Sequence, residues 1–410
     1  MTNFYDVTVS LGNGLNTGIQ KVVKAIFSEL NLNEISAVVG VSNKSCQFFT
    51  IDKNQFDKIV NRQTAISNSA KIRFLNVAKP FLRKVINLMN EFHLGRKLKE
   101  DLQRFFWPNL SVFTEPISSN PILLSKEDSY ITFDAFWNSE ADFHRLEIAF
   151  KANSKIIIFV HDLFPLSNPN WFEESSVIGF KNYFTRGVEM AEILLFSSNS
   201  VLHEFKRLFP QNKAKKFKLP MGVGVDSSYH LSTQPMPRDK ILMIGTLEPR
   251  KNYLEILNWY EKWDGNENLV IVGRDGWKSG EIKKKIRHLN KVGFKDKEVT
   301  WKSKVTDFEL QQLLNQAKIG ICASLDEGYG LPLREFIAYG VPIVASDISV
   351  FREENYEGIA YFRVGDNRSL TKAVESQLKN PKYPKKSQLS TWSESYVCLM
   401  KILVNEGLSK

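Results

Sequence analysis

The sequence is poor in cysteine and contains no long hydrophobic run. Its three cysteines, Cys46, Cys322 and Cys398, lie far apart without C-x-x-C spacing, so neither a disulfide framework nor a zinc site is indicated. We therefore expect a reducing compartment, the cytoplasm. No stretch approaches the roughly 18 apolar residues of a membrane-spanning helix, and the opening MTNFYDVTVSLGNG lacks the basic start and apolar core of a signal peptide. We expect a protein that is neither exported nor integral to a membrane.

Signatures of metal and nucleic-acid binding are missing as well. There is no D-x-D motif to hold a diphosphate through a metal ion, so no metal cofactor is expected. There is no helix-turn-helix, zinc-finger or RNA-recognition pattern, which argues against a nucleic-acid partner. What the sequence does contain is 43% hydrophobic and 24% charged residues over 410 positions. This is the balance of a globular protein long enough for two domains of about 150 to 200 residues.

Basic residues exceed acidic ones, and the formal net charge is +10. An excess of this size favours an anionic partner, either a metabolite or a membrane surface. Between Lys71 and Arg104, nine basic residues stand against three acidic ones and alternate with apolar residues at helical spacing, which predicts a basic amphipathic helix beginning near Pro80. A helix that docks on an anionic membrane or acceptor and a solvated helix packed on its own domain fit this pattern equally well. The candidate contact residues are Arg83, Lys84, Arg96 and Lys97.

Short aliphatic runs alternate with amphipathic stretches along the chain, which is typical of parallel βαβ units. In the first half we expect strands at residues 6–11, 35–42, 130–136, 155–160, 192–198 and 217–223. A polar, proline-bearing stretch at residues 227–239 then predicts a linker. In the second half we expect strands at 240–244, 268–272, 298–301, 319–323, 342–345 and 359–362, and helices at 253–263, 280–291, 307–316, 370–378 and 392–404. Ligands bind at the carboxyl ends of strands in such sheets, so the residues after each strand are the informative ones.

A glycine-rich loop, Gly12 to Gly18, follows the first expected strand and precedes a helix. Backbone N–H groups in such a loop suit a phosphate or carboxylate. The spacing is G-x-G-x-x-x-G, and no acidic residue ends the second strand near Ser42, so the match to a dinucleotide-binding fingerprint is weak. A plain tight turn is the alternative.

Two further strand ends carry charged side chains. His161 and Asp162 follow the strand 155–160, where a structural histidine and a catalytic one are both consistent with the position. Gly245 follows the strand 240–244, and Arg250 and Lys251 come before the next helix. Glycine allows close backbone approach, and the two cations suit a diphosphate leaving group without a metal. An exposed basic turn is the alternative interpretation.

The stretch DEGYGLPLRE after the strand 319–323 is the most specific motif. Glu327 and Glu335 have seven residues between them, the first in a glycine loop and the second in a helix beginning near Pro332. Carboxylates accept hydrogen bonds from ribose or sugar hydroxyls. Backbone N–H groups around a glycine loop and at a helix N-terminus can reach a phosphate. The candidates for that contact are Gly328, Gly330 and Leu331.

Taken together, these motifs resemble glycosyltransferase family 4, a retaining family with the GT-B fold. The similarity is spread over TGIQKVVKAI, VHDLFP, GVGVD, GTLEPRKN, VGRDGW, the paired-glutamate motif, AYGVPIVASD and the closing tryptophan helix. The fold class that it implies is α/β, with two Rossmann-like, doubly wound parallel-sheet domains facing across a cleft. Residues 1–226 would form the acceptor-side domain and residues 238–390 the nucleotide-sugar domain, with the helix in 391–410 packing back on the first.

The resemblance also implies roles for individual residues. Arg250 and Lys251 would bind the donor diphosphate, and Glu335 would hold the nucleotide ribose. Glu327 would contact the donor sugar, and His161 would face the reacting sugar, which makes these two the candidate catalytic residues. The N-terminal loop at Thr17 and Gly18 would lie against the pyrophosphate.

The implied reaction is retaining transfer of a hexose-like sugar, with mannose as a guess, from a nucleoside diphosphate sugar to a hydroxyl of a glycan or lipid-linked acceptor. Capsule or lipopolysaccharide synthesis at the inner face of the cytoplasmic membrane would use such a peripheral enzyme, with no cofactor. Two departures from the family pattern leave donor binding as expected, but they mean that no particular sugar specificity is carried over from the family. Arg334 stands where the family has an apolar residue, and residues 349–354, SVFREE, lack the usual Leu-Pro-Glu.

Two rival functions remain. An NAD-dependent oxidoreductase would use the first glycine loop, but it would need neither Arg250-Lys251 nor the glutamate pair. A non-catalytic sugar- or membrane-binding subunit would keep the fold, but it could lose His161 or one of the glutamates, and this chain retains them.

Overall fold

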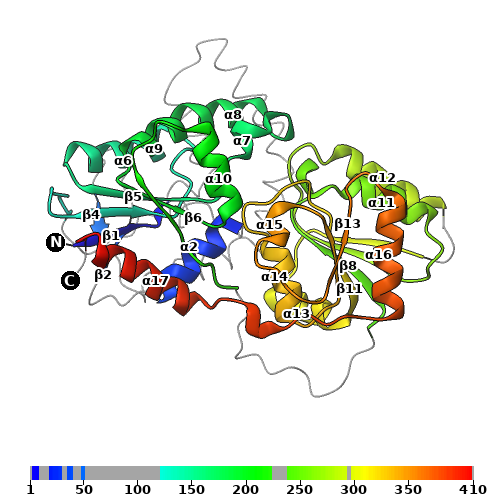
Figure 1. Cartoon of the computed structure of the whole chain (residues 1–410). Coiled ribbons are helices and arrows are strands. Elements are labelled where there is room, and N and C mark those ends of the chain that lie inside the picture. The colour runs from blue at the N-terminus through cyan, green and yellow to red at the C-terminus, as the bar shows by residue number, and fades with distance from the viewer. Residues whose placement is uncertain are drawn as a thin grey trace, which may run out of the picture. The chain divides into compact units, whose positions relative to one another are not determined.

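The computed structural model describes residues 2–8, 18–29, 35–39, 48–50, 121–223, 238–292 and 297–408 (Figure 1). Most of the expected N-terminal glycine loop and most of the expected linker lie outside the described residues. So does the expected basic helix with Arg83, Lys84, Arg96 and Lys97.

The first sheet has seven strands in the order β3-β2-β1-β4-β5-β6-β7. The pairs β1–β2, β1–β4, β4–β5 and β6–β7 are parallel, as expected, but β3 pairs antiparallel with β2 at the edge and was not predicted. The strands are β1 (Asn3–Asp6), β2 (Ile35–Val39), β3 (Phe49–Thr50), β4 (Ser129–Thr132), β5 (Lys155–Val160), β6 (Ile193–Phe196) and β7 (Lys215–Lys218). The associated helices are α2 (Gly18–Glu29), α6 (Glu140–Lys151), α7 (Phe164–Ser167), α8 (Glu174–Gly179), α9 (Thr185–Met190) and α10 (Asn199–Leu208). Short 3-10 and π turns lie at Pro169–Trp171 and Phe180–Phe184.

The second sheet has six strands in the order β10-β9-β8-β11-β12-β13, and every pairing is parallel. Its strands are β8 (Lys240–Ile244), β9 (Asn268–Val272), β10 (Val299–Lys302), β11 (Ala317–Cys322), β12 (Ile343–Ser346) and β13 (Ile359–Phe362). Its helices are α11 (Tyr253–Lys262), α12 (Gly280–Val292), α13 (Asp307–Gln316), α14 (Leu331–Ala338), α15 (Ser349–Arg352) and α16 (Asn367–Lys379), with 3-10 turns at Pro249–Lys251 and Lys386–Gln388. The last helix of the described chain is α17 (Trp392–Asn405). This is a doubly wound sheet whose strand order reverses between β8 and β11, the point where such sheets bind ligands.

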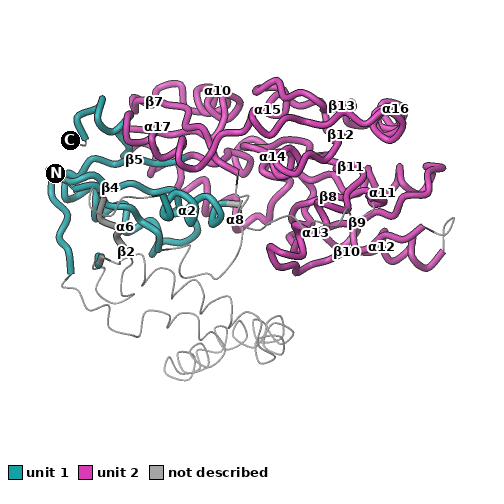
Figure 2. The backbone as a smooth tube through the Cα atoms, turned by 90° about the horizontal axis from the view of Figure 1, so that it is seen from below, with its two compact units in different colours: residues 1–159, 190–192, 402–410 teal, residues 160–189, 193–401 magenta. Residues whose placement is uncertain are grey.

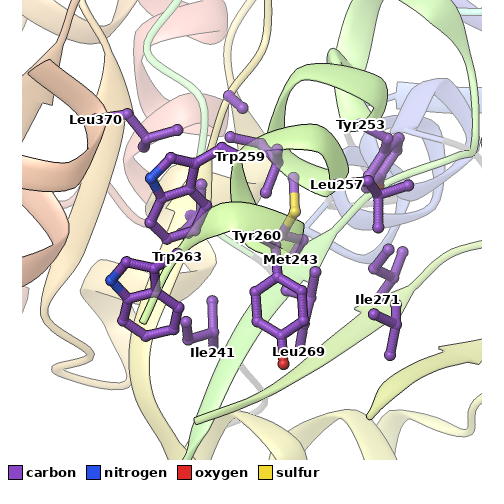
Figure 3. Packing of buried hydrophobic residues seen from close by; sticks show 14 of the residues in the cluster. Ile241, Met243, Tyr253, Leu257, Trp259, Tyr260, Trp263, Leu269, Ile271 and Leu370 are labelled. Atoms are coloured by element: carbon purple, nitrogen blue, oxygen red, sulfur yellow. The ribbon is translucent and has the colours of Figure 1, made fainter. Parts of the chain in front are cut away.

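The second sheet buries both of its faces. Along β8, Ile241 and Met243 pack into one hydrophobic cluster while Leu242 packs into another, as the alternation of a strand requires. Figure 3 shows part of the first cluster, where Trp259 of α11 and Trp263, the residue that follows the helix, stack with ring centroids 5.0 Å apart. Helices α11, α12 and α16 contribute to this cluster, and α13 and α14 to the other. Burial on both faces explains why the strands read as continuous apolar runs in the sequence.

Local hydrogen bonds explain where the first strand ends and where helix α13 begins. The first strand ends at Asp6, where residues 6–11 were expected, because the Thr8 N–H and hydroxyl both donate to the Asp6 carboxylate and close a turn. Helix α13 begins where expected, because Thr306 and Glu309 form a reciprocal capping box.

The last strand of the first sheet also lies elsewhere than predicted. Strand β7 occupies Lys215–Lys218, whereas residues 217–223 were expected. Three of its four residues are lysines, which is typical of an edge strand and gives no apolar signal in the sequence. The strand ends two residues before Pro220, which has no backbone N–H to donate to a neighbouring strand.

Grouped by its contacts, the chain forms two compact units (Figure 2). One unit holds residues 1–159, 190–192 and 402–410, and the other holds residues 160–189 and 193–401. The second sheet lies entirely in the second unit, and the last residues of α17 group with the first. Among the described residues, no helix is both long and apolar enough to cross a membrane.

Candidate active site

The residues after β8 and β11 meet at the point where the strand order of the second sheet reverses. The β8 loop packs closely against the β9 loop: a Cβ on Gly273 would lie 1.7 Å from the Gly245 carbonyl oxygen, so only glycine fits at position 273. Gly245 has a φ of +147°, and its carbonyl oxygen accepts a hydrogen bond of 2.7 Å from the Tyr253 hydroxyl. This packing fixes the backbone that leads into the 3-10 turn carrying Arg250 and Lys251.

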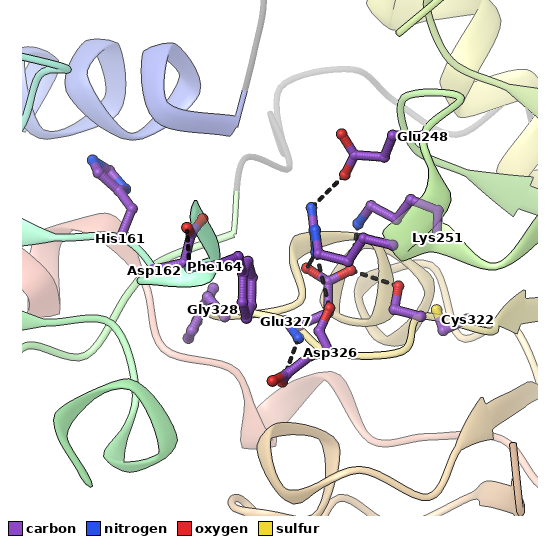
Figure 4. A network of polar contacts seen from close by, with 12 residues as sticks. His161, Asp162, Phe164, Glu248, Lys251, Cys322, Asp326, Glu327 and Gly328 are labelled. Atoms are coloured by element: carbon purple, nitrogen blue, oxygen red, sulfur yellow. Dashed lines mark hydrogen bonds and ion pairs between the residues drawn. The ribbon is translucent and has the colours of Figure 1, made fainter. Parts of the chain in front are cut away.

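Arg250 and Lys251 bind the carboxylate of Glu327 (Figure 4). An Arg250 Nη1–Glu327 Oε2 distance of 2.7 Å marks one ion pair, and Lys251 Nζ contacts the other carboxylate oxygen, Oε1. The Ser324 hydroxyl donates to Oε1 at 2.7 Å, and Arg250 Nη2 donates to Glu248 at 2.7 Å. The sequence motifs after β8 and β11 therefore form one buried cluster of two cations and two carboxylates.

The two cations control the ionisation of Glu327. Burial by itself raises the pKa of this carboxyl, but Arg250 and Lys251 outweigh burial and lower the pKa to about 2. Burial likewise opposes the charge of Arg250, and the carboxylates of Glu327 and Glu248 raise its pKa above the ordinary value. Glu327 is therefore an anion at neutral pH and acts here as a hydrogen-bond acceptor, not as an acid.

Two residues after β5 adjoin this cluster. The Phe164 ring lies against the Arg250 guanidinium, with 5.1 Å between Cζ and the ring centroid. Burial raises the pKa of Asp162 to about 6, although the charge of Arg250 opposes the shift. His161, the residue expected to face the sugar, points its imidazole away from the cluster in Figure 4, and its carbonyl oxygen accepts a bond from Ser197. The sequence pointed to Asp162 beside His161 at the end of this strand, but Phe164, in the same VHDLFP motif, was not singled out.

The glycine loop after Glu327 is held by its backbone. The Gly328 carbonyl oxygen accepts hydrogen bonds from the hydroxyls of Ser197, at 3.0 Å, and Ser198, at 2.7 Å. A Cβ on Gly328 would lie 2.2 Å from the His161 carbonyl oxygen. Gly330 takes the left-handed conformation, with φ of +81°, and precedes Leu331, the first residue of α14. The first N–H groups of a helix have no partner inside it, so this loop presents backbone donors.

Glu335 is buried in the second turn of α14. Its charge acts on the buried Cys322 thiol, as do the charges of Lys251 and Glu327, so the second glutamate faces the same region. Burial raises the pKa of that thiol, which leaves Cys322 neutral. These groups surround a narrow hollow, and its lining includes Ile244, Lys251, Tyr253, Cys322, Ser324, Glu327, Pro332 and Phe351.

Three further points concern Gly18, the groups that could bind a metal, and site residues that the sequence did not reveal. Gly18 is the first residue of α2, in the first unit. Among the described residues, no group of three or more histidine, cysteine, aspartate or glutamate side chains is arranged to hold a metal ion. Sequence reasoning missed Glu248 and Ser324, although both lie in the loops that follow β8 and β11, and a position after a strand end is itself a signal.

Comparison with known proteins identifies a family model and several relatives of this chain. Residues 232–390 match the family model of glycosyl transferases group 1. The serotype-specific mannosyltransferase WbdA of Escherichia coli is 28% identical over 313 residues, covering 70% of this chain and 38% of the relative. The O-antigen chain mannosyltransferase RfbU of Salmonella typhimurium is 26% identical over 228 residues, covering 53% of this chain and 60% of the relative. The chain thus spans less than two thirds of the length of either.

Solved structures match the whole fold. Sucrose-phosphate synthase from Thermosynechococcus elongatus superposes with a TM-score of 0.61 at 12% identity, covering 99% of both chains. The Anabaena protein HepE, solved with UDP and glucose, has a TM-score of 0.57 at 12% identity, covering 100% of this chain and 98% of that one. The expected fold class, α/β with two Rossmann-like domains of the GT-B type, is confirmed.

Proposed function

We propose that this chain is a nucleotide-sugar-dependent glycosyltransferase, which the match of residues 232–390 to the model of glycosyl transferases group 1 supports. The observation that carries the proposal is the buried cluster of Arg250, Lys251 and Glu327 at the reversal point of the second sheet. Two cations and an acceptor carboxylate at this place suit a nucleoside diphosphate sugar, which carries a diphosphate next to sugar hydroxyls.

Arg250 and Lys251 neutralise the charge that grows on the leaving diphosphate. Because these cations bind Glu327 in the structure, a donor diphosphate has to replace the carboxylate at one or both of them. The exchange turns Glu327 toward the donor sugar, whose hydroxyls donate to the ionised carboxylate. Backbone N–H groups at Gly330 and Leu331 add donors to the phosphate, as helix N-termini commonly do. The protein supplies this positive charge itself, so the proposed reaction needs no metal ion.

The transfer breaks the bond between the anomeric carbon and the diphosphate oxygen and forms a bond to an acceptor hydroxyl, whose proton passes to the leaving diphosphate. We assign retention of configuration, with same-face substitution, on the resemblance to glycosyltransferase family 4. The same resemblance assigns three further contacts. Glu335 holds the ribose, Gly18 lies against the pyrophosphate, and His161 faces the reacting sugar. These assignments make Glu327 and His161 the candidate catalytic residues.

The relatives suggest the class of product. Two of them are named mannosyltransferases, and one of these acts on O-antigen chains according to its name. We therefore propose that the sugar is mannose or a similar hexose, and that the acceptor is a glycan or lipid-linked glycan of a surface polysaccharide. Synthesis of such acceptors places the enzyme in the cytoplasm, at the inner face of the membrane, where the expected basic helix would contact anionic lipid.

A donor screen tests the proposed function. The full chain is incubated with GDP-, UDP- and dTDP-sugars, and release of the nucleoside diphosphate is measured with and without EDTA. We expect release from one donor, unaffected by EDTA and lost in Arg250→Ala and Lys251→Ala, because both cations stabilise the leaving group. Lys262→Ala, an exposed lysine at the end of α11, is the control and should be active. Absence of release and of nucleotide binding with every donor would contradict the proposal, and activity that EDTA abolishes and manganese restores would contradict its metal-free chemistry.

A further inference from the structure

Arg334 is a buried cation that has no carboxylate partner among the residues that the structure describes. Its side chain lies in α14, one residue before Glu335, and only 1% of the residue is exposed. Two other buried arginines are paired with acids: Arg145 with Asp6 and Asp142, and Arg250 with Glu248 and Glu327. Within the described part of the chain, Arg334 forms no such ion pair. A charge in this position is costly unless neighbouring groups compensate for it.

The groups that compensate for the charge come from the glycine loop and from Tyr356. Arg334 Nη1 donates to the carbonyl oxygen of Tyr329, the residue between Gly328 and Gly330. The guanidinium carbon lies 3.6 Å from the centroid of the Tyr329 ring and 5.3 Å from that of Tyr356. The flat guanidinium thus binds the loop through one carbonyl and one aromatic face, a geometry that lysine cannot reproduce.

Part of the hydrogen-bonding capacity of Arg334 remains unused. Its buried Nε has no hydrogen-bond partner among the described residues. One carbonyl and two aromatic rings compensate for a full positive charge only in part. The positive charge of Arg334 thus lies next to the glycine loop, near the N-terminus of α14, where a helix carries partial positive charge of its own.

Tyr329 is held at three points, and this fixes the loop. Its carbonyl oxygen and its ring are bound by Arg334, and its hydroxyl donates to the carbonyl oxygen of Met221. The neighbouring Gly330 is equally confined: a Cβ there would lie 2.6 Å from the Phe351 ring and 3.4 Å from Arg334 Nη1. Phe351 also lines the hollow that contains Lys251 and Glu327. The contacts of Arg334 therefore extend to the wall of the candidate active site.

We propose that Arg334 is a positioning residue for the nucleoside diphosphate of the donor. It locks the Gly328–Gly330 loop in the conformation that presents the first N–H groups of α14 to the diphosphate, and it supplies positive charge next to that loop. The inference rests on the proposed function and concerns the same site. Arg334 is also a departure from the resembled family, which commonly has an apolar residue at this position.

The test compares Arg334→Leu, Arg334→Lys and a control in the same domain. Gln377→Leu is the control, because Gln377 is a buried polar residue of α16 that donates to the carbonyl oxygens of Ile343 and Gly358, away from the glycine loop. Each protein is titrated with GDP and with UDP by calorimetry, its thermal unfolding is recorded, and hydrogen exchange is measured across residues 328–331.

We expect Arg334→Leu to bind the preferred nucleotide at least tenfold more weakly, because the loss of a charge-assisted hydrogen bond and of the fixed loop both act on the same ligand. Its unfolding temperature should change little, since an apolar side chain tolerates this environment. The loop should exchange faster. Arg334→Lys should lose most of the affinity as well, because it retains the charge without the planar fork. Gln377→Leu should unfold at a lower temperature and bind nucleotide as the wild type does.

The possible outcomes separate the two hypotheses. Wild-type affinity in Arg334→Leu, with unchanged loop exchange, would overturn the positioning role while leaving the proposed function intact. If Arg334→Leu does not fold, Arg334→Lys decides: wild-type affinity there would show that charge alone matters and would overturn the positioning role. If the wild type binds neither GDP nor UDP, dTDP is titrated as well, and absence of binding to all three contradicts the proposed function and with it the donor role of Arg334. In that case, hydrogen exchange across residues 328–331 shows only whether Arg334 restrains the backbone of the glycine loop.

Discussion

Replacing Glu327 with glutamine should destabilise the protein at neutral pH and not at low pH. Glutamine imitates the protonated carboxyl, so the variant loses what ionisation contributes to stability. Lowering the pKa from 4.5 to about 2 corresponds to about 3 kcal/mol of stabilisation when Glu327 is ionised. Because the folded-state pKa lies below the ordinary value, this stabilisation is complete above about pH 4.5 and disappears as the pH falls toward 2.

Thermal unfolding of wild type and Glu327→Gln as a function of pH tests this reasoning. At pH 7 the variant should unfold about 6 to 12 °C lower, given roughly 2 to 4 °C per kcal/mol for a domain of this size. The difference should shrink steadily below about pH 4.5. Glu281→Gln is the control, because Glu281 pairs with Lys284 on an exposed surface and its loss should change stability by less than about 1 kcal/mol. A difference between wild type and Glu327→Gln that is absent at pH 7, or equally large at pH 7 and pH 3.5, would refute the account of this ion cluster.

Three further predictions follow from other residues. Gly273→Ala should abolish soluble expression or lower the unfolding temperature strongly, because its Cβ would overlap the Gly245 carbonyl oxygen; a variant as stable as the wild type would contradict this packing. Asp162→Asn should be more stable than the wild type above about pH 6 and equally stable near pH 4, because burial raises the pKa of Asp162 and penalises its ionised form; thermal unfolding at both values checks the sign. Replacing the basic residues of the expected N-terminal helix with glutamine should abolish salt-sensitive binding to acidic vesicles and leave donor hydrolysis intact, and sedimentation of the variant with acidic vesicles at low salt would contradict it. The residues concerned are Arg83, Lys84, Arg96 and Lys97.

The sequence predicts the full bounds of four strands, but it misses or displaces the strands at the two edges of the first sheet. The strands at residues 155–160, 240–244, 268–272 and 359–362 have the predicted bounds. The first three lie inside a sheet, where apolar residues on both faces mark the full length of the strand. By contrast, β3 has only two residues and β7 is mostly lysine. Neither leaves a hydrophobic pattern that periodicity can detect.

The candidate site shows the same division. Strand ends and side-chain chemistry were enough to single out Arg250, Lys251 and Glu327, and the structure places the three in contact. Their pairing joins residues 77 and 76 positions apart in the chain, which no local pattern encodes. The stacking of Phe164 on Arg250 is similarly long-range, and it depends on how helix α7 packs. Residue type and position thus predict which groups bear the chemistry, whereas packing decides which of them meet.

The lysines of β7 have a consequence for the behaviour of the protein at high concentration. An outer strand leaves a row of backbone N–H and C=O groups that another chain can pair with, which is how many β-sheets aggregate. In β7 the exposed side chains of that row carry positive charge, and Lys218 is already engaged by Glu353 and Glu354. At the opposite edge, β3 offers only two residues. The β7 edge of a second molecule would bring the same lysine charges and be repelled, and β3 is too short to pair with a long strand. Both features therefore oppose the pairing of first sheets between molecules into fibrils.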